Sequence, residues 1–166
     1  FPYSFVYNKN NFIKIKSIID IFSNFKKTVE FQHKSWITAD VIDYLSGLNI
    51  PLCLRDVPKF ENLSDENNFL LTSDFSYVKF YGRNTDSWWQ PLTEEDKTDY
   101  NYSQKLLNLW TKNIHLKLLP NVKDLYLIFC NIKNCNSVVN AGYLRKKFAV
   151  KPAFAGDNLE LSFELN

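Results

Sequence analysis

The chain has 166 residues, of which 45% are hydrophobic and 16% aromatic, and this composition fits a single domain with a sizeable core. Its 20 basic and 18 acidic residues give a formal net charge of +2. Strong non-specific nucleic-acid binders concentrate positive charge, so the bulk charge does not by itself indicate one. No apolar run approaches the roughly 20 residues that cross a bilayer, so no membrane partner is expected.

The three cysteines, Cys53, Cys130 and Cys135, are odd in number, and two of them fall within or at the end of predicted strands. Buried free thiols are common at such positions, which favours a reducing compartment, the cytoplasm. The C-x4-C spacing of the last two has no second pair, so it does not predict a zinc site. The chain starts at Phe1 and contains no Met, which suggests a fragment of a longer protein.

Hydrophobic periodicity and capping residues predict four helices. The first covers about residues 12–25, and Asn10 or Asn11 can cap its start. The other three are predicted to begin after the capping residues Thr38, Ser103 and Asn136.

Four strands are predicted from short apolar or alternating runs, at 28–32, 50–56, 77–82 and 125–131. They alternate with the helices, which is typical of a parallel sheet with right-handed crossovers. Polar residues on the strands, including Glu30, Lys79 and Tyr81, favour a closed barrel over a flat doubly wound sheet. Only four glycines are present and none forms a phosphate loop, which argues against a nucleotide-binding sheet.

The segment 30–36 reads E-F-Q-H-K-S-W and resembles the E-F-R-H-x-S-W motif of the YecE-like family, domain of unknown function 72. The segment 77–84, Y-V-K-F-Y-G-R-N, followed by Trp88-Trp89, resembles the Y-V-R-x-H-G-R-N…W-W segment of that family. Shorter matches follow at 102–103 with Trp110, and at 128–131 with 140–141.

This resemblance implies a (β/α)8 TIM-barrel fold of roughly 250 residues. Residues 1–148 would supply its C-terminal half, strands 5–8 with flanking helices, and 149–166 a tail or added strand. The missing N-terminal half would then be a partner, and the chain alone would be poorly soluble or self-associating because its edge strands are unpaired. Gln32, Tyr81 and Cys130 depart from the family pattern, where Arg, His and Asn stand.

Three residues are candidates for catalysis: Glu30 in the middle of the first predicted strand, His33 just past its end, and Asp56 at the end of the second. A buried carboxylate such as Glu30 must be paired, protonated or bound to a ligand, and an ion pair with Lys79 or Arg83 is the structural alternative. His33 is either a catalytic group or packed on Trp36, and Asp56 either a catalytic group or a cap. Together the three candidates could bind a divalent metal, but their spacing is not that of a known metal motif, so the cofactor stays open.

The candidates for ligand binding would converge with these at one opening. Arg83 follows Gly82, which allows close approach of a ligand, and can form two hydrogen bonds to a phosphate or carboxylate; a salt bridge with Glu30 or Asp56 is the alternative. Tryptophans can stack on a base or sugar, although they more often anchor loops. The full set is Arg83, Asn84, Asn131, Lys79, Tyr81, Trp36, Trp88 and Trp89.

Three functional hypotheses remain open. The first is an enzyme that acts on a phosphorylated or otherwise anionic small molecule or nucleic-acid end at the C-terminal mouth of the barrel. The second is a non-catalytic module that binds single-stranded or damaged nucleic acid through Arg83, Lys79 and the tryptophans. The third is an inactive, truncated copy, because Tyr81 and Cys130 replace family residues in the presumed site.

Overall fold

The computed structural model describes residues 1–149. The predicted C-terminal tail or added strand at 149–166 lies outside the described residues except for Ala149. The strands are β1 (Leu54–Asp56), β2 (Phe75–Phe80) and β3 (Asp124–Phe129), all parallel and hydrogen-bonded in the order β1-β2-β3. The helices are α1 (Lys9–Ile21), α2 (Ala39–Gly47), α3 (Glu94–Lys97), α4 (Gln104–Asn113) and α5 (Asn136–Ala149).

The prediction of a half TIM barrel is wrong. The described residues form an open three-stranded sheet, and the segment 28–32 is not one of its strands but forms an isolated parallel bridge, between Val29 and Leu52, just before β1. The polar strand residues that suggested a barrel interior instead form one face of this open sheet. The alternation of strands and helices did correctly indicate an α/β fold with parallel pairing.

The helix starts follow local capping chemistry. Ser103 caps α4 as predicted, since its Oγ accepts a hydrogen bond from the Leu106 N–H at 3.2 Å. α1 begins earlier than predicted, because Asn8 rather than Asn10 or Asn11 occupies the cap and accepts from the Asn11 N–H. None of the helices within residues 1–149 is both long and apolar enough to cross a membrane.

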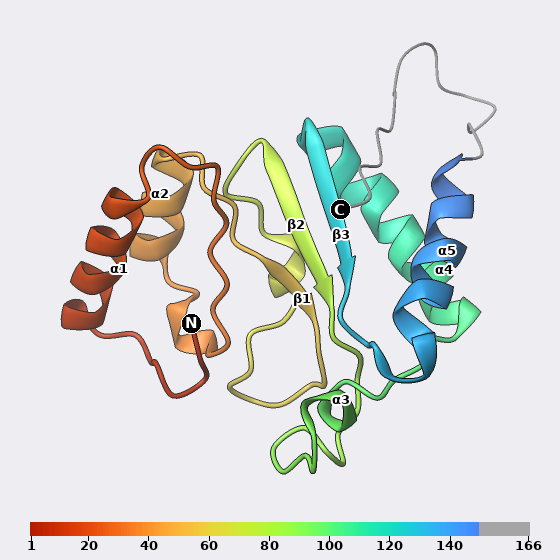
Figure 1. Ribbon diagram of the computed structural model, residues 1–166. Helices are drawn as coiled ribbons and strands as arrows, with labels where there is room; N and C mark the ends of the chain where they lie inside the picture. The colour runs from red at the N-terminus through yellow and green to blue at the C-terminus, as the bar shows by residue number, and fades with distance from the viewer. Residues whose placement is uncertain (150–166) are drawn as a thin grey trace.

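Two hydrophobic cores lie at opposite ends of the sheet (Figure 1). In the first, α1 and α2 pack against the segment around Val29 and Phe31, with Trp36 stacked on Phe31 at a ring separation of 4.5 Å. In the second, α4 and α5 cover β1 and β2. The buried residues of this second core include Leu54, Val78, Phe80, Leu107, Trp110, Ile114 and Leu144.

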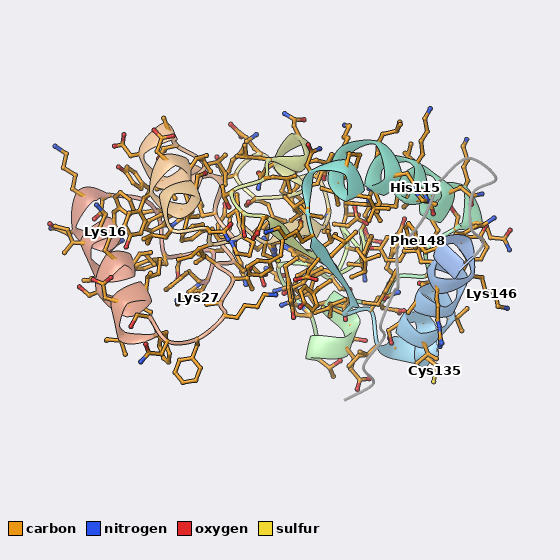
Figure 2. The ribbon with its side chains drawn as sticks, turned by 90° about the horizontal axis from the view of Figure 1, so that it is seen from above. Lys16, Lys27, His115, Cys135, Lys146 and Phe148 are labelled. Carbon is orange, nitrogen blue, oxygen red and sulfur yellow. The ribbon has the colours of Figure 1, made fainter. Side chains whose placement is uncertain are left out.

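The strand register separates the sheet into two faces. Leu54 pairs with Val78 and Arg55 with Lys79, and successive residues of a strand point to opposite sides. The side that carries Leu54 and Val78 meets α4 and α5. We call the other side, which carries Arg55, Lys79 and Tyr81, the polar face. Figure 2 views the molecule from above, with Lys16 on α1 at one end and, at the other, Lys146 on α5 and Cys135 just before α5.

Candidate functional site

Glu30 is the centre of a charged cluster on the polar face. Its Oε2 accepts a hydrogen bond from Lys79 Nζ at 2.9 Å, and its Oε1 accepts one from the Tyr81 hydroxyl at 2.9 Å. Arg55 Nε also lies 2.9 Å from Oε1, but as an ion pair without hydrogen-bond geometry. The predicted structural pairing of Glu30 with Lys79 is therefore present, and sequence reasoning missed Arg55.

Arg55 is the buried member of this cluster, with 1% of its surface exposed. Its Nη1 donates to the Ser64 carbonyl at 3.0 Å, and its guanidinium carbon lies 5.2 Å from the centre of the Tyr81 ring. These contacts fix the guanidinium beneath the Glu30 carboxylate. The alternation that placed Lys79 on this face also indicates Arg55, its direct neighbour across β1 and β2.

The electrostatics of the cluster keep its groups in fixed ionisation states. Burial acts to raise the pKa of Glu30, but Arg55 and Lys79 outweigh it and hold the pKa below the usual 4.5. Burial acts to lower the pKa of Lys79, but Tyr81 and Glu30 raise it overall. Burial and the Glu30 carboxylate raise the pKa of Tyr81 to about 12. Near neutral pH, Glu30 is thus anionic, Lys79 cationic and Tyr81 neutral.

Asp56 and Arg83 form a second ion pair at the carboxyl ends of β1 and β2. Asp56 Oδ1 accepts from Arg83 Nε at 2.8 Å and from Arg83 Nη2 at 2.6 Å. Asp56 Oδ2 is buried and has no hydrogen-bond partner among the described residues. Burial raises the pKa of Asp56 and outweighs the opposing effect of Arg83. The Tyr102 hydroxyl lies near this carboxylate, but the hydrogen bond it clearly makes is with the Gly82 N–H, at 2.9 Å.

The structure places the predicted convergent residues in two groups rather than one. Glu30 lies with Lys79 and Tyr81, whereas Asp56 lies with Arg83. Asp56 follows Arg55 directly in β1, so its side chain points to the opposite face of the sheet. Gly82 has a φ of 92° and ends the strand alternation after Tyr81, which lets Arg83 reach Asp56.

His33 caps the short turn Lys34–Trp36. Its Nδ1 accepts from the Ser35 N–H at 3.1 Å and lies 2.8 Å from Ser35 Oγ. The ring packs beside Tyr3, with the ring centres 4.9 Å apart, and not on Trp36. His33 is thus close in sequence to Glu30 but is held by a different set of contacts.

The two candidate asparagines hold loops. Asn84 donates to the Asp96 carbonyl at 2.9 Å and accepts from the Asp86 N–H at 3.2 Å. Asn131 is fully buried, and its Nδ2 donates to the Tyr100 carbonyl at 2.7 Å and to Asn140 Oδ1 at 2.8 Å. This network ties the end of β3 to α5 and to the loop before α4.

The three candidate tryptophans have different environments. Trp36 is fully buried in the first core, and its Nε1 donates to the Phe5 carbonyl at 2.6 Å. Trp88 is buried in a third small cluster with Val57 and Leu63. Trp89 is 47% exposed, and its ring lies 4.7 Å from Tyr3 and 5.4 Å from Phe60. Trp89 is therefore the one of the three whose ring is accessible from solvent.

Two of the cysteines have thiols whose pKa is raised above the usual value, so both stay protonated near neutral pH. Burial and Glu30 raise the pKa of Cys53 to about 12, and burial raises that of Cys130. Within residues 1–149, no three His, Cys, Asp or Glu side chains gather closely enough to hold a metal ion. The arrangement is suited to binding through fixed charges.

The surface also carries two open grooves at the amino ends of the strands, away from Asp56 and Arg83. The larger, of about 410 Å³, and the smaller, of about 260 Å³, share Lys26, Lys27 and Phe75 in their walls. Lys26 reaches over the sheet to Asp124 Oδ2 at 3.0 Å and lies 4.4 Å from the Phe75 ring centre. The grooves contain none of the predicted site residues, so we give more weight to the charged cluster.

Solved structures with a similar fold are longer than this chain. A DUF72 family protein from Thermotoga maritima MSB8 matches with a TM-score of 0.76 and 25% identity, over 90% of this chain and 55% of that chain. Two structures of a DUF72 family protein from Enterococcus faecalis V583 match with TM-scores of 0.79 and 0.78, at 19% and 20% identity. They cover 96% and 90% of this chain and 61% and 59% of theirs, so this chain spans less than two thirds of each relative.

No curated protein matches the chain. The family model described as "Protein of unknown function DUF72" matches residues 1–159, which is most of the sequence. The chain belongs to the DUF72 family.

Proposed function

We propose that the protein binds a small anionic ligand, such as a phosphate or carboxylate ester, on the polar face beside Lys79. The observation that carries the proposal is that Lys79, although paired with Glu30, keeps 26% of its side chain exposed. Arg83, which follows the end of the same strand and pairs with Asp56, is 31% exposed. On the polar face two cations, Arg55 and Lys79, stand against one carboxylate, Glu30, which leaves an excess positive charge for an incoming anion.

The ionisation states favour binding over proton transfer. A general base works best with a pKa near the working pH. The pKa of Glu30 is lowered and that of Tyr81 is raised to about 12, so neither exchanges a proton readily near neutral pH. We therefore assign Glu30 to orienting Lys79 and Arg55, and we place ligand binding ahead of an enzymatic reaction on the same anion.

A second candidate, binding of single-stranded nucleic acid, is favoured by the exposed ring of Trp89. Base stacking on an aromatic side chain contributes about 1–3 kcal/mol per base. Because Trp36 and Trp88 are buried, Trp89 with Tyr3 and Phe60 offers one stacking position rather than a row. The small anionic ligand is the better supported of the two.

The proposal also includes a subfamily and a cellular compartment for the protein. Within the DUF72 family, the segments 30–36 and 77–84 support a YecE-like member. The three cysteines are free, which supports a reducing compartment, the cytoplasm.

The test is calorimetric titration with inorganic phosphate, ribose 5-phosphate and a ten-residue oligodeoxythymidine. Lys79→Met should weaken binding of both phosphates about tenfold, equivalent to about 1.4 kcal/mol. Lys105→Met, which removes an exposed cation on α4, is the matched control and should leave binding unchanged. Tyr81→Phe keeps the ring but frees Glu30 from its hydroxyl, and serves as a second variant if Lys79→Met unfolds.

The alternatives give different results. Equal affinity of the wild type and Lys79→Met for the phosphates would contradict the proposal. Tighter binding of the oligonucleotide, falling steeply with added salt and lost in Trp89→Leu, would favour the nucleic-acid module instead.

A further inference from the structure

Charged residues are distributed unevenly along the chain. Residues 1–99 contain 11 basic and 14 acidic side chains, whereas residues 100–149 contain 8 basic side chains and a single acidic one, Asp124. The net charges of these two parts are −3 and +7, although that of the whole sequence is only +2. Charge asymmetry of this kind is typical of proteins that bind nucleic acid or a membrane surface.

Most of the basic side chains in the second part lie on two helices. Lys123 and Lys133 are engaged in ion pairs with carboxylates. The other six lie on α4, on α5 and on the π-helical turn Ile114–Leu118 that continues α4, and all six are exposed. The sequences of these three segments contain no Asp or Glu, so the helices carry unbalanced positive charge.

Two of the lysines lie over aromatic rings. Lys117 Nζ is 4.5 Å from the centre of the Phe69 ring, and Lys147 Nζ is 5.1 Å from the centre of the Tyr143 ring. Such contacts orient an ammonium group without neutralising its charge. The positive charge of both lysines therefore stays available to an anionic partner.

Exposed apolar residues lie among these cations. Leu109 is 53% exposed and Leu116 is 63% exposed, and they stand two helical turns apart with the exposed Lys112 between them. Their spacing of three and four residues places the three side chains on one side of the helix. On α5, Val139 is 62% exposed and Lys146 is exposed as well. We call the outward side of the two helices, marked by these five residues, the basic helical face.

The basic helical face extends over two adjacent helices. The Tyr143 hydroxyl of α5 donates a hydrogen bond to Asn108 Oδ1 of α4 at 3.0 Å, and the ring centres of His115 and Phe148 are 5.1 Å apart. Figure 1 shows α4 and α5 together on one side of the sheet, and Figure 2 shows Lys146 at the end of the molecule away from α1. The two helices cover the side of the sheet opposite to the polar face.

We propose that the basic helical face docks on the surface of an anionic lipid bilayer. Lysines beside lipid phosphate groups and leucines within the headgroup region are typical of a helix that lies on a membrane. Surface docking needs no spanning segment, so the lack of a long apolar run in the sequence does not oppose it. Because this face is separate from Lys79, the proposal does not rest on binding of a small anion at the polar face.

Lipid fits this face better than nucleic acid does. Single-stranded nucleic acid binds to cations and to aromatic rings that stack on its bases. The apolar side chains exposed on this face are leucine and valine, which gain free energy when they leave water but do not stack on a base. Lysine side chains reach from an apolar boundary to phosphate groups, because their stems are apolar and flexible.

The test is co-sedimentation of the full chain with phosphatidylcholine vesicles, prepared with and without phosphatidylglycerol. We expect binding only to the vesicles that contain phosphatidylglycerol, and weaker binding as salt is added. A variant that combines Lys112→Gln with Lys146→Gln should lower the partition coefficient at least about tenfold, since each cation near an anionic membrane strengthens binding about fivefold.

Matched variants on α1 control for total charge and total hydrophobicity. Lys9→Gln with Lys14→Gln removes the same charge from exposed positions and should change the partition coefficient less than about twofold. Leu109→Ser with Leu116→Ser should weaken binding even at high salt, whereas Ile13→Ser with Ile21→Ser should not. Thermal melting of each variant distinguishes loss of folding from loss of docking.

Four results would overturn the proposal. One is absent binding, or equal binding to the two kinds of vesicle. Another is an equal loss of binding in the lysine variants of α1 and of the basic helical face. The third is an oligodeoxythymidine that needs Lys112 and Lys146 but not the two leucines, which would assign the face to nucleic acid. The fourth is self-association at low salt that needs the same lysines, which would assign the face to the acidic part of a second copy. None of these readouts depends on phosphate binding beside Lys79.

Discussion

Lys79 Nζ and Glu30 Oε2 lie 2.9 Å apart, and this contact ties β2 to a segment that is not itself a strand of the sheet. Arg55 is buried beneath the same carboxylate. Glu30→Ala would leave Arg55 buried without its counter-ion, and breaking a buried pair in this way costs about 3 kcal/mol. We expect the free energy of unfolding, measured by urea titration, to fall by about this amount.

The control for this change is Glu95→Ala. Glu95 is exposed and its carboxylate makes no hydrogen bond or ion pair with the described residues, so its loss should alter stability by less than about 0.5 kcal/mol. Similar losses in the two variants would mean that the Glu30 cluster does not stabilise the fold.

The same cluster predicts a pH dependence. The pKa of Glu30 in the folded chain is below its usual 4.5, so the folded state binds this proton less tightly than the unfolded state. The stabilisation is complete above pH 4.5 and is lost as the pH falls through the folded pKa. The stability of the wild type should therefore fall toward that of Glu30→Gln as the solution is acidified below this value. If the difference in stability between the wild type and Glu30→Gln stays constant across the acid range, this pH dependence is refuted.

Asp56 should change the stability of the fold with pH in the opposite direction. Burial raises its pKa above the usual 3.8, so the folded state binds the proton more tightly than the unfolded state. The carboxylate therefore opposes folding at neutral pH, and this cost is relieved as the pH falls through the folded pKa. We expect the stability of the wild type relative to Asp56→Asn to rise on acidification. Urea titrations of both proteins across the acid range measure this difference in stability. If the stability of the wild type relative to Asp56→Asn falls instead, the ion pair with Arg83 outweighs the effect of burial on the pKa of Asp56.

The backbone conformation of Gly82 predicts that a larger residue at this position destabilises the fold. It adopts a φ of 92°, and a Cβ there would collide with the Tyr100 side chain. Gly82→Ala should therefore lower the free energy of unfolding by more than about 1 kcal/mol. Gly47→Ala is the control, because nothing lies within 4 Å of a Cβ at this helical position. It should be neutral or stabilising by up to about 1 kcal/mol. Equal effects in thermal melts would contradict the close approach of Tyr100.

The sequence was informative where local chemistry decides the structure. The Ser103 cap, the parallel pairing of β2 with its neighbours and the pairing of Glu30 with Lys79 all follow from residue type and alternation. The prediction of a barrel was wrong, because a polar strand face fits the interior of a barrel and one side of an open sheet equally well. Alternation alone does not say what covers that face.

The grouping of the candidate residues in the structure differs from the single opening that was expected, for a geometric reason. Placing Glu30, Asp56 and Arg83 at one opening assumed that strand alternation continues to Arg83, but the positive φ of Gly82 redirects the chain. Arg55 was missed because a charge between Leu54 and Asp56 looks like a strand end, whereas the fold buries it. Burial of Trp36 and Trp88 depends on packing with residues distant in sequence, which composition does not reveal.

The four tryptophans differ sharply in exposure, which makes the environment of Trp89 measurable by fluorescence. Trp36, Trp88 and Trp110 are buried and Trp89 is 47% exposed, so acrylamide should quench the fluorescence of Trp89 preferentially. Trp89→Leu should remove most of the quenchable signal, whereas Trp88→Leu should remove little of it and should destabilise the cluster of Val57 and Leu63. If a ring-bearing anion such as a nucleotide binds with its ring on Trp89, adding it should protect the wild type from acrylamide. Protection that persists in Trp89→Leu would place the ring of the ligand elsewhere.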